Sequence, residues 1–432
     1  MTSTEETAAP RRLGALRAFA RLPRVMQLLV LTQLAFNIGF YMVLPYLATH
    51  LTENLALAGA VVGLVLGLRT FSQQGLFVVG GTLTDRVGAK PVVLAGCALR
   101  VAGFVLLGLA ESLPAVLAGA VLTGFAAALF SPAVESSLAR EAGEQAEAGG
   151  PTRADVFAML AISGQVGTVV GPLVGTALLL VGFQLSCLVA AAVFVLIGLG
   201  HLRWLPRRPP QHAGEPVLAG WAEVVRNRRF MAFAAGYSGY LLCYNQLYLA
   251  LPAELRRATG DQAALGWLFV LASVMVITGQ MAATRWGRRI GAARAIVLGF
   301  GLMTGSFLTV AAAVLLPDST ADMPLWPAVT MVVLLTAGEM LAVPVAQDLV
   351  PRLAGERRLG VYFGVLSSAG GLAVLIGSTV VGALLDPAVA APAVPWLVLA
   401  GVPAASALII GLLARRGSLT ASPGRSRDGL RA

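Results

Sequence analysis

Long apolar runs constrain this chain more than any other feature of its sequence. With 57% hydrophobic and only 12% charged residues among 432, the composition excludes a soluble globule. Twelve runs are long enough to cross a bilayer as helices. They lie at 25–49, 58–81, 91–110, 113–138, 155–180, 183–205, 230–255, 262–284, 292–316, 325–350, 359–385 and 394–414. We therefore expect an all-α membrane protein with twelve transmembrane helices.

Polar segments divide the chain into five parts. The N-terminal region is polar and basic up to Arg24, and the first apolar run has spanning length, so this run is expected to anchor the chain rather than to be cleaved. The five parts are an arginine-rich arm (1–24), a six-helix bundle (25–205), a Pro- and Arg-rich linker (206–229), a second six-helix bundle (230–414) and a basic tail (415–432).

The basic residues predict the orientation. Of the 31 Lys and Arg, 27 fall in the arm, the linker, the tail and the loops on their side of the membrane. Arg256 and Arg257 lie on the other side, and Arg69 and Arg100 lie inside spans. The positive-inside rule then places both termini in the cytoplasm of a multi-pass membrane protein. The net charge of +10 is explained by this topology, so we expect no nucleic-acid partner.

The two halves repeat each other. Gly164 and Gly171 in the fifth run match Gly370 and Gly377 in the eleventh at a constant offset. Such a repeat is typical of transporters built from two related bundles, with a substrate site between them. We therefore expect two pseudo-symmetric six-helix bundles.

The densest polar signal is the stretch from Gly80 to Pro91. Gly80 and Gly81 are expected to end one helix, Gly88 to allow a turn with positive φ, and Pro91 to begin the next helix. Asp85 can bond to the exposed amides of a neighbouring helix N-terminus. The stretch thus predicts a conformational latch, in which Glu135 pairs with a base of the turn. The latch residues are Gly81, Asp85, Arg86, Gly88, Lys90 and Glu135.

Three segments carry a family resemblance. The pattern G-G-x-L-x-D-R-x-G-x-K from Gly80 resembles the loop between helices 2 and 3 of the major facilitator superfamily of secondary transporters. Residues 67–76 resemble helix 2 of bacterial multidrug-resistance transporters in the drug:proton antiporter branch. A third segment resembles the antiporter motif of that branch through Gly167, Gly171, Pro172 and Gly175.

The resemblance implies a major facilitator fold in the inner (cytoplasmic) membrane and proton-coupled efflux by alternating access. It also implies that the helix held by Asp85 is the eleventh, beginning near Leu359. One departure is Ala120, which stands where the family has an arginine in helix 4.

Charges inside the spans are candidates for transport residues. Deep charges are costly unless they face protein or water, so function is their default interpretation. Arg69 either lines the substrate cavity or ties helices together, and for Arg100 we favour the second role. Glu339 is the single acid near a bilayer midplane. It is either a proton carrier or a permanently protonated, hydrogen-bonded group, and we take proton coupling as the working hypothesis.

Polar and aromatic faces indicate a substrate cavity. Tyrosines recur in the seventh run at three- and four-residue steps up to Tyr248, which places them on one helix face. Such a stripe either binds bulky or cationic ligands or simply packs. The candidate cavity residues are Gln33, Asn37, Tyr41, Arg69, Gln73, Tyr237, Tyr240, Tyr244 and Asn245.

These features predict a secondary active transporter that exports hydrophobic or cationic small molecules in exchange for protons. The alternatives are a dedicated exporter of one endogenous product, such as a siderophore, sugar or antibiotic, and a non-transporting sensor or lipid-handling protein. The sequence shows no nucleotide-binding loop, metal cluster or nucleophile–base grouping, so we expect no enzyme, cofactor or metal. The expected partners are a small-molecule substrate, protons and the lipid bilayer, with the chain a monomer.

Overall fold

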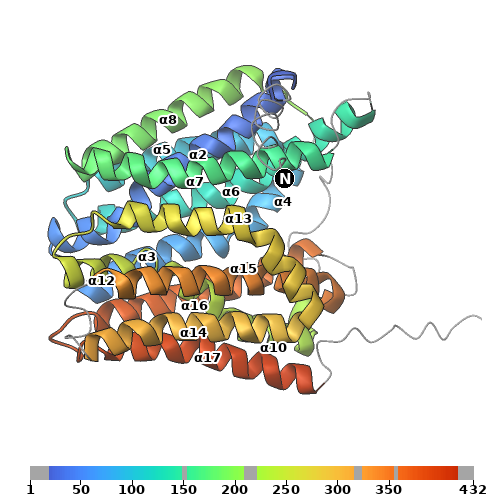
Figure 1. Cartoon of the computed structure of the whole chain (residues 1–432). Helices are drawn as coiled ribbons and strands as arrows, with labels where there is room; N and C mark the ends of the chain where they lie inside the picture. Colours follow the sequence, from blue (N-terminus) through green and yellow to red (C-terminus); the bar gives the residue numbers. More distant parts are fainter. Residues whose placement is uncertain (1–18, 148–152, 209–220, 316–323, 355–358, 417–432) are drawn as a thin grey trace, which may run out of the picture.

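The structure is a computed structural model, and it describes residues 19–147, 153–208, 221–315, 324–354 and 359–416. Two groups of roughly parallel and antiparallel helices lie side by side, one from each half of the chain (Figure 1). The helices of the first half are α2 (Arg24–Glu53), α3 (Gly59–Gln74), α4 (Phe77–Val87), α5 (Ala89–Leu109), α6 (Leu113–Glu147), α7 (Arg153–Leu179) and α8 (Phe183–Trp204).

The second half is also built from helices in the part of the chain that the structure describes. They are α9 (Trp221–Arg226), α10 (Arg228–Tyr237), α11 (Gly239–Asn245), α12 (Ala250–Thr259), α13 (Leu265–Ile290), α14 (Ala292–Leu315), α15 (Trp326–Ala354), α16 (Leu359–Leu384) and α17 (Val394–Arg415). We call the end of the molecule that carries the loops 54–58 and 260–264 the far end, and the opposite end, where α8 leads into the linker, the linker end.

Ten helices within the described residues are long and apolar enough to cross a membrane. They confirm the predicted all-α membrane class. The other two predicted spans are interrupted: 58–81 is divided into α3 and α4 at Gly75, and 230–255 is divided among α10, α11 and α12. The count of twelve spanning helices therefore stays a prediction.

The polar stretch that begins at Gly80 folds differently from its expected form. Helix α4 continues through Gly80 and Gly81 and ends only at Val87, and Gly80 lies where α4 approaches α6. A Cβ atom at Gly80 would collide with the carbonyl oxygen of Ala128. The turn itself is confined to Gly88, whose φ of +92° confirms the predicted positive value. Pro91 is the third residue of α5, where a missing amide still costs no helical hydrogen bond.

Helix α7 packs closely on α2 through the glycines of the antiporter-like motif. A Cβ at Gly167 would lie 2.6 Å from the carbonyl oxygen of Leu34, and one at Gly175 would lie 2.6 Å from that of Met42. At Gly171 it would lie 2.7 Å from the Cβ of Tyr41. Small residues that let two backbones approach are the usual basis of helix association in membranes.

The matching glycines of the second half have an equivalent position. Gly370 and Gly377 of α16 face Leu241 and Leu242 of α11. Thus α16 packs on α11 as α7 packs on α2. The register of the repeat read from the sequence agrees with this packing.

The two halves meet along a seam between α3 and α16. Cβ atoms at Gly59 and Gly63 would collide with the backbone carbonyls of Gly382 and Ser378, and one at Gly67 would lie 2.8 Å from the Cα of Leu375. Hydrogen is therefore the largest substituent that fits at these positions. We call Gly59, Gly63 and Gly67 with the facing backbone of α16 the glycine seam.

The far end is closed by polar contacts between the halves. The guanidinium of Arg256 lies 3.0 Å from the carboxylate of Glu53, and the Thr49 hydroxyl donates a 2.7 Å hydrogen bond to Gln262. At the linker end, by contrast, α13 bends away from α7 in Figure 1. The structure is thus held together more tightly at the far end.

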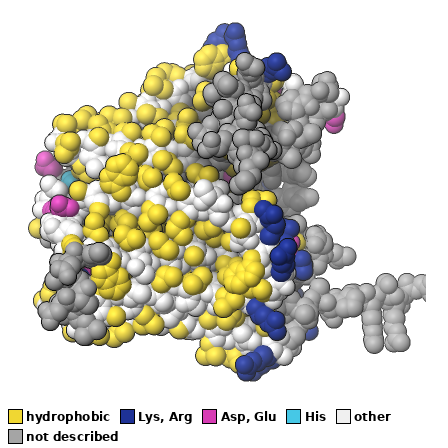
Figure 2. All heavy atoms as spheres, in the orientation of Figure 1, with side chains coloured by type: hydrophobic (Ala, Val, Ile, Leu, Met, Phe, Trp, Pro, Cys, Tyr) yellow, Lys and Arg dark blue, Asp and Glu magenta, His cyan; other side chains and the backbone are white. Residues whose placement is uncertain are grey.

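The surface agrees with a membrane position. Apolar side chains cover the face shown in Figure 2, and Lys and Arg side chains gather at its linker end. This is the separation of apolar and basic surface expected for a protein whose linker end lies at a membrane boundary.

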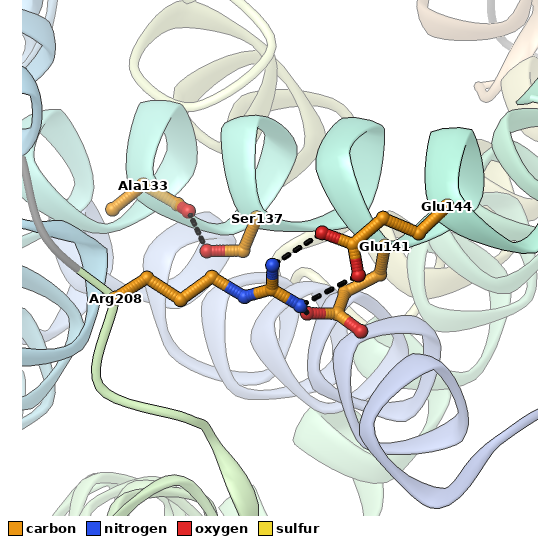
Figure 3. A network of polar contacts seen from close by, with 5 residues as sticks. All are labelled: Ala133, Ser137, Glu141, Glu144 and Arg208. Atoms are coloured by element: carbon orange, nitrogen blue, oxygen red, sulfur yellow. Dashed lines mark hydrogen bonds and ion pairs between the residues drawn. The ribbon is translucent and has the colours of Figure 1, made fainter. Parts of the chain in front are cut away.

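The start of the linker is fixed to an extension of α6. Arg208 bonds to Glu144 with both terminal nitrogens and contacts Glu141 at 2.6 Å (Figure 3). The hydrogen bond with Arg208 lowers the pKa of the Glu144 carboxyl below its usual value and raises the pKa of the arginine. We call this group the linker clamp. The sequence did not indicate it, because Arg208 lies 64 positions after Glu144 and 67 positions after Glu141.

Candidate functional site

Glu339 lies in α15, and its carboxylate accepts a 3.0 Å hydrogen bond from the phenol of Tyr240. The side chain is half-buried rather than sealed in the core. A carboxyl that is partly accessible and held by a single neutral donor can accept a hydrogen bond when ionised and donate one when protonated. This geometry suits the proton-coupling role, although the second interpretation, a permanently protonated group, has the same partner.

The tyrosines of α10, α11 and the following turn form a continuous column of rings, in which the first pair is stacked, the second is tilted and the third meets edge to face. Neighbouring rings lie 5.5 Å apart for Tyr237 and Tyr240, 6.3 Å for Tyr240 and Tyr244, and 6.0 Å for Tyr244 and Tyr248. The two end members are buried, and the two middle ones are half-buried. The predicted common face is therefore present. In this conformation its ends pack, and only its middle can line a cavity.

The column touches the first half of the chain. The hydroxyls of Tyr41 and Tyr244 lie 3.3 Å apart, and the amide of Asn245 donates a 3.2 Å hydrogen bond to the hydroxyl of Thr70. Asn245 is buried, so here it joins α11 to α3 instead of facing a cavity.

Arg69 is buried, with 4% of its surface exposed. It donates a 2.6 Å hydrogen bond to Gln73, four residues further along α3, and its guanidinium lies 4.6 Å from the ring centre of Phe40. Among the ion pairs of the described residues, none joins Arg69 to Glu339. The side chains of Phe40, Tyr41, Tyr244 and Tyr240 form successive contacts from one charge to the other.

Arg100 belongs to the packing of the first half. It is 1% exposed, and it donates a 2.9 Å hydrogen bond to the carbonyl of Thr123 in α6. Its guanidinium lies within 4.4–5.9 Å of four phenylalanine ring centres. Such cation–π contacts stabilise a desolvated arginine. The arrangement agrees with the favoured structural role, and it places an arginine against the helix in which Ala120 departs from the family pattern.

A cavity of about 420 Å³ lies between α2, α6 and α7. Asn37 is held at its wall by a 2.8 Å hydrogen bond to the carbonyl of Gly164, and Gln33 donates to the Asn37 side chain at 3.3 Å. The residues lining it are Gln33, Asn37, Glu135, Phe157, Leu160, Ala161, Gly164 and Gln165. The predicted polar face of α2 thus borders a cavity.

The expected pairing of Glu135 with a base of the polar turn is wrong. Glu135 is exposed and lines the cavity, while Lys90 donates hydrogen bonds of 2.8 and 2.6 Å to the carbonyls of Leu202 and Leu205. Lys90 therefore caps the end of α8, where carbonyls lack helical partners.

The contact predicted between Asp85 and the start of α16 falls on side chains outside the described part of the chain, those of Asp85 and Leu359. The role of Asp85 consequently stays a prediction, together with the roles of Gly81 and Arg86 in the same element.

A second cavity, of about 640 Å³, lies between the halves at the far end. Three of its charged groups are paired: Arg257 bonds to both carboxylate oxygens of Glu254, at 2.8 and 2.7 Å, and Arg256 pairs with Glu53. The fourth, Asp386, accepts a 2.9 Å hydrogen bond from the backbone amide of Ala388. The sequence singled out both arginines only as exceptions to the charge rule. Their departure from the positive-inside rule was the one feature of the sequence that could have indicated a contact at the far end.

Comparisons with known proteins agree with the fold and the class of site. The model of the Major Facilitator Superfamily matches residues 29–378 and 237–429. An uncharacterized MFS-type transporter of Mycobacterium tuberculosis (strain H37Rv) is 39% identical over 387 residues, which are 87% of this chain and 89% of the relative. The multidrug resistance protein MdtH of Cronobacter sakazakii is 30% identical over 375 residues, with 86% and 89% covered.

Solved structures share the fold at low identity. The peptide transporter POT in complex with sulfate aligns with a TM-score of 0.75 and 16% identity, covering 94% of this chain and 99% of that one. The nucleoside transporter NupG aligns with a TM-score of 0.72 and 16% identity, covering 91% and 100%. Together with the family match, these similarities identify a multi-pass membrane transporter rather than an enzyme: the chain belongs to the Major Facilitator Superfamily.

Proposed function

We propose that this chain exports hydrophobic or cationic small molecules across the cytoplasmic membrane in exchange for protons, with the linker end in the cytoplasm. The observation that carries the proposal is the contact between Glu339 and Tyr240. It joins a titratable group to an aromatic column that reaches the other half of the protein through Tyr41. A change of charge at Glu339 therefore acts on the tyrosine column, which also forms a contact between the two halves.

Two further observations support this function. The tyrosine column offers flat apolar surfaces with polar tips, which suit bulky ligands of varied structure. Relatives at about 30% identity are named multidrug resistance proteins. In the proposed cycle, substrate enters from the linker end, Glu339 takes up a proton from the far side, and the halves alternate around the glycine seam.

Transport in reconstituted vesicles with an imposed pH gradient tests the proposal. Glu339→Gln should abolish accumulation driven by the gradient while leaving substrate exchange without a gradient measurable, because only net proton movement requires the carboxyl. Glu339→Asp should retain part of the driven flux. Glu147→Gln removes an acid from the exposed end of α6 and serves as the control.

Two results would contradict the proposal. If Glu339→Gln still accumulates substrate in proportion to the gradient, the proton carrier lies elsewhere. If wild-type vesicles move none of a broad panel of compounds, the chain is a dedicated exporter of another molecule or does not transport.

A further inference from the structure

The cavity between α2, α6 and α7 contains a carboxylate that the proposed proton cycle does not use. Glu135 is exposed in this cavity, and within the described part of the chain it forms no hydrogen bond or ion pair. The cavity volume of about 420 Å³ falls within the range of small-molecule sites, roughly 300–1,000 Å³. A negative charge on the wall of a ligand-sized cavity selects for a positive ligand.

The other walls complement an amphipathic cation. Gln33, Asn37 and Gln165 supply amide groups, while Leu160 and Phe157 supply apolar surface. The ring of Phe157 is partly open, with 36% of the residue exposed. A carboxylate and an aromatic face on one cavity suit a bulky ligand that carries a single positive charge.

The cavity is acidic rather than neutralised by nearby bases. None of its lining residues is Lys or Arg. On α6, the nearest basic residue further along the helix is Arg140, which contributes to the field at Glu144 near the linker clamp. The arginines Arg69 and Arg100 are buried among aromatic rings.

We propose that this cavity recognises the cationic group of the transported molecule, with Glu135 as its counter-charge. This inference rests on the proposed function and gives its substrate a chemical class: organic monocations with an aromatic or aliphatic body. The two acids then have separate tasks, since Glu135 in the first half binds substrate and Glu339 in the second half carries the proton. A positive substrate is recognised before the halves exchange access.

Equilibrium binding to purified protein in phosphatidylcholine nanodiscs tests this assignment. The probes are tetraphenylphosphonium, a permanent cation, and triphenylphosphine oxide, a neutral compound with similar aryl groups. Glu135→Gln should weaken binding of the cation by about tenfold and change binding of the neutral compound by less than about twofold. Glu135→Asp should lie between the wild type and the Gln variant, because it keeps the charge and shortens its reach.

Glu147→Gln is the matched control, because it removes the same charge from the same helix outside the cavity. Its affinity for both probes should equal that of the wild type. Equal cation affinity in Glu135→Gln and wild type would overturn the inference, and so would an equal loss for both probes or an equal loss in Glu147→Gln.

The same proteins separate this inference from the proposed function. If the cation binds through Glu135 but wild-type vesicles show no gradient-driven efflux of it, the binding site stands and the proposed function fails. If the pH gradient drives efflux of the cation in the wild type, and Glu135→Gln changes neither this efflux nor the affinity for the cation, the proposed function stands and this site fails.

Discussion

The hydroxyl groups of Tyr41 and Tyr244 lie 3.3 Å apart, although the two residues belong to different halves of the chain. Each residue lies on the polar face of its own half, and the sequence repeat places these two faces at equivalent positions. Any movement that separates the bundles at this level must break this contact. Its strength therefore contributes to the balance between the two access states.

A double-mutant cycle of Tyr41→Phe and Tyr244→Phe measures that contribution. A neutral hydrogen bond contributes about 0.5–1.5 kcal/mol net, so each single variant should shift the population toward an opened far end. The double variant should show less than the sum of both shifts. Distances between spin labels at Asn54 and Val389 report the populations. Fully additive shifts would mean that the two hydroxyls do not interact.

Gly63→Ala should disfavour the closed far end. The added Cβ would collide with the carbonyl of Ser378, and both groups are backbone or bonded directly to it, so a side-chain rotation cannot relieve the contact. The same spin-label distances should lengthen. Gly301→Ala is the control, because nothing lies within 4 Å of its Cβ position. Gly→Ala within a helix normally stabilises by about 0.5–1 kcal/mol. A loss of the closed far end in Gly63→Ala, but not in Gly301→Ala, therefore identifies the contact at the glycine seam.

The ion pair between Arg256 and Glu53 should contribute little to the closed state. Both side chains are partly exposed, at 31% and 53%, and such pairs contribute about 0–1 kcal/mol. Arg256→Ala should therefore change the far-end distance distribution slightly. Exchanging the charges, Arg256→Glu with Glu53→Arg, should restore it, and 1 M salt should remove the difference between the variants. A large, salt-independent effect would assign Arg256 a different role.

Acid should release the linker clamp. Because the Arg208 hydrogen bond lowers the pKa of Glu144 in the folded state, the clamp is fully stabilising above the ordinary value of 4.5. Its contribution is lost as pH falls through the lowered folded value. A spin label at Arg207 should become more mobile over that acidic range. Glu144→Gln should show the mobile spectrum at neutral pH and lose most of the pH response, whereas unchanged mobility would exclude a fixed linker.

Lys90 should stabilise the first bundle through the end of α8. A cation that bonds to terminal helix carbonyls contributes about 0.3–1 kcal/mol, so Lys90→Met should lower the thermal unfolding temperature by a few degrees. Lys90→Arg retains the charge and should recover part of the loss. An identical unfolding temperature in all three proteins would show that the two hydrogen bonds to Leu202 and Leu205 make no net contribution to the stability of the folded state.

Local pattern predicted the fold, and long-range packing determined most of the departures from it. Hydropathy located the spans because each one must bury apolar surface over a fixed length. It could not place the end of α4, since the position of Gly80 is fixed by the backbone of α6 rather than by the polarity of its neighbours. The interruptions near Gly75 and Ser238 are not marked by proline, which explains why two long apolar runs were read as single helices.

The candidate site was predictable where the residues share one helix. The spacing of Arg69 and Gln73 places them on one helix face, where the structure shows a hydrogen bond between them. The spacing of the tyrosines predicted their common face. Contacts between helices were not accessible in this way. Phe40, which faces Arg69, is one of 17 phenylalanines, and nothing in its sequence context distinguishes it. Glu135 was expected to pair with a base of the polar turn, whereas α6 carries it to the wall of a cavity.

The glycine seam also determines where this sequence can vary. Lipid-facing side chains such as Leu196 and Ile376, 68% and 58% exposed, can exchange with other apolar residues because lipid adapts to their shape. Positions 59 and 63 face backbone atoms and accept no side chain. A saturation mutagenesis scan scored by transport should therefore rank these two chemically featureless positions among its most sensitive, for reasons of space alone.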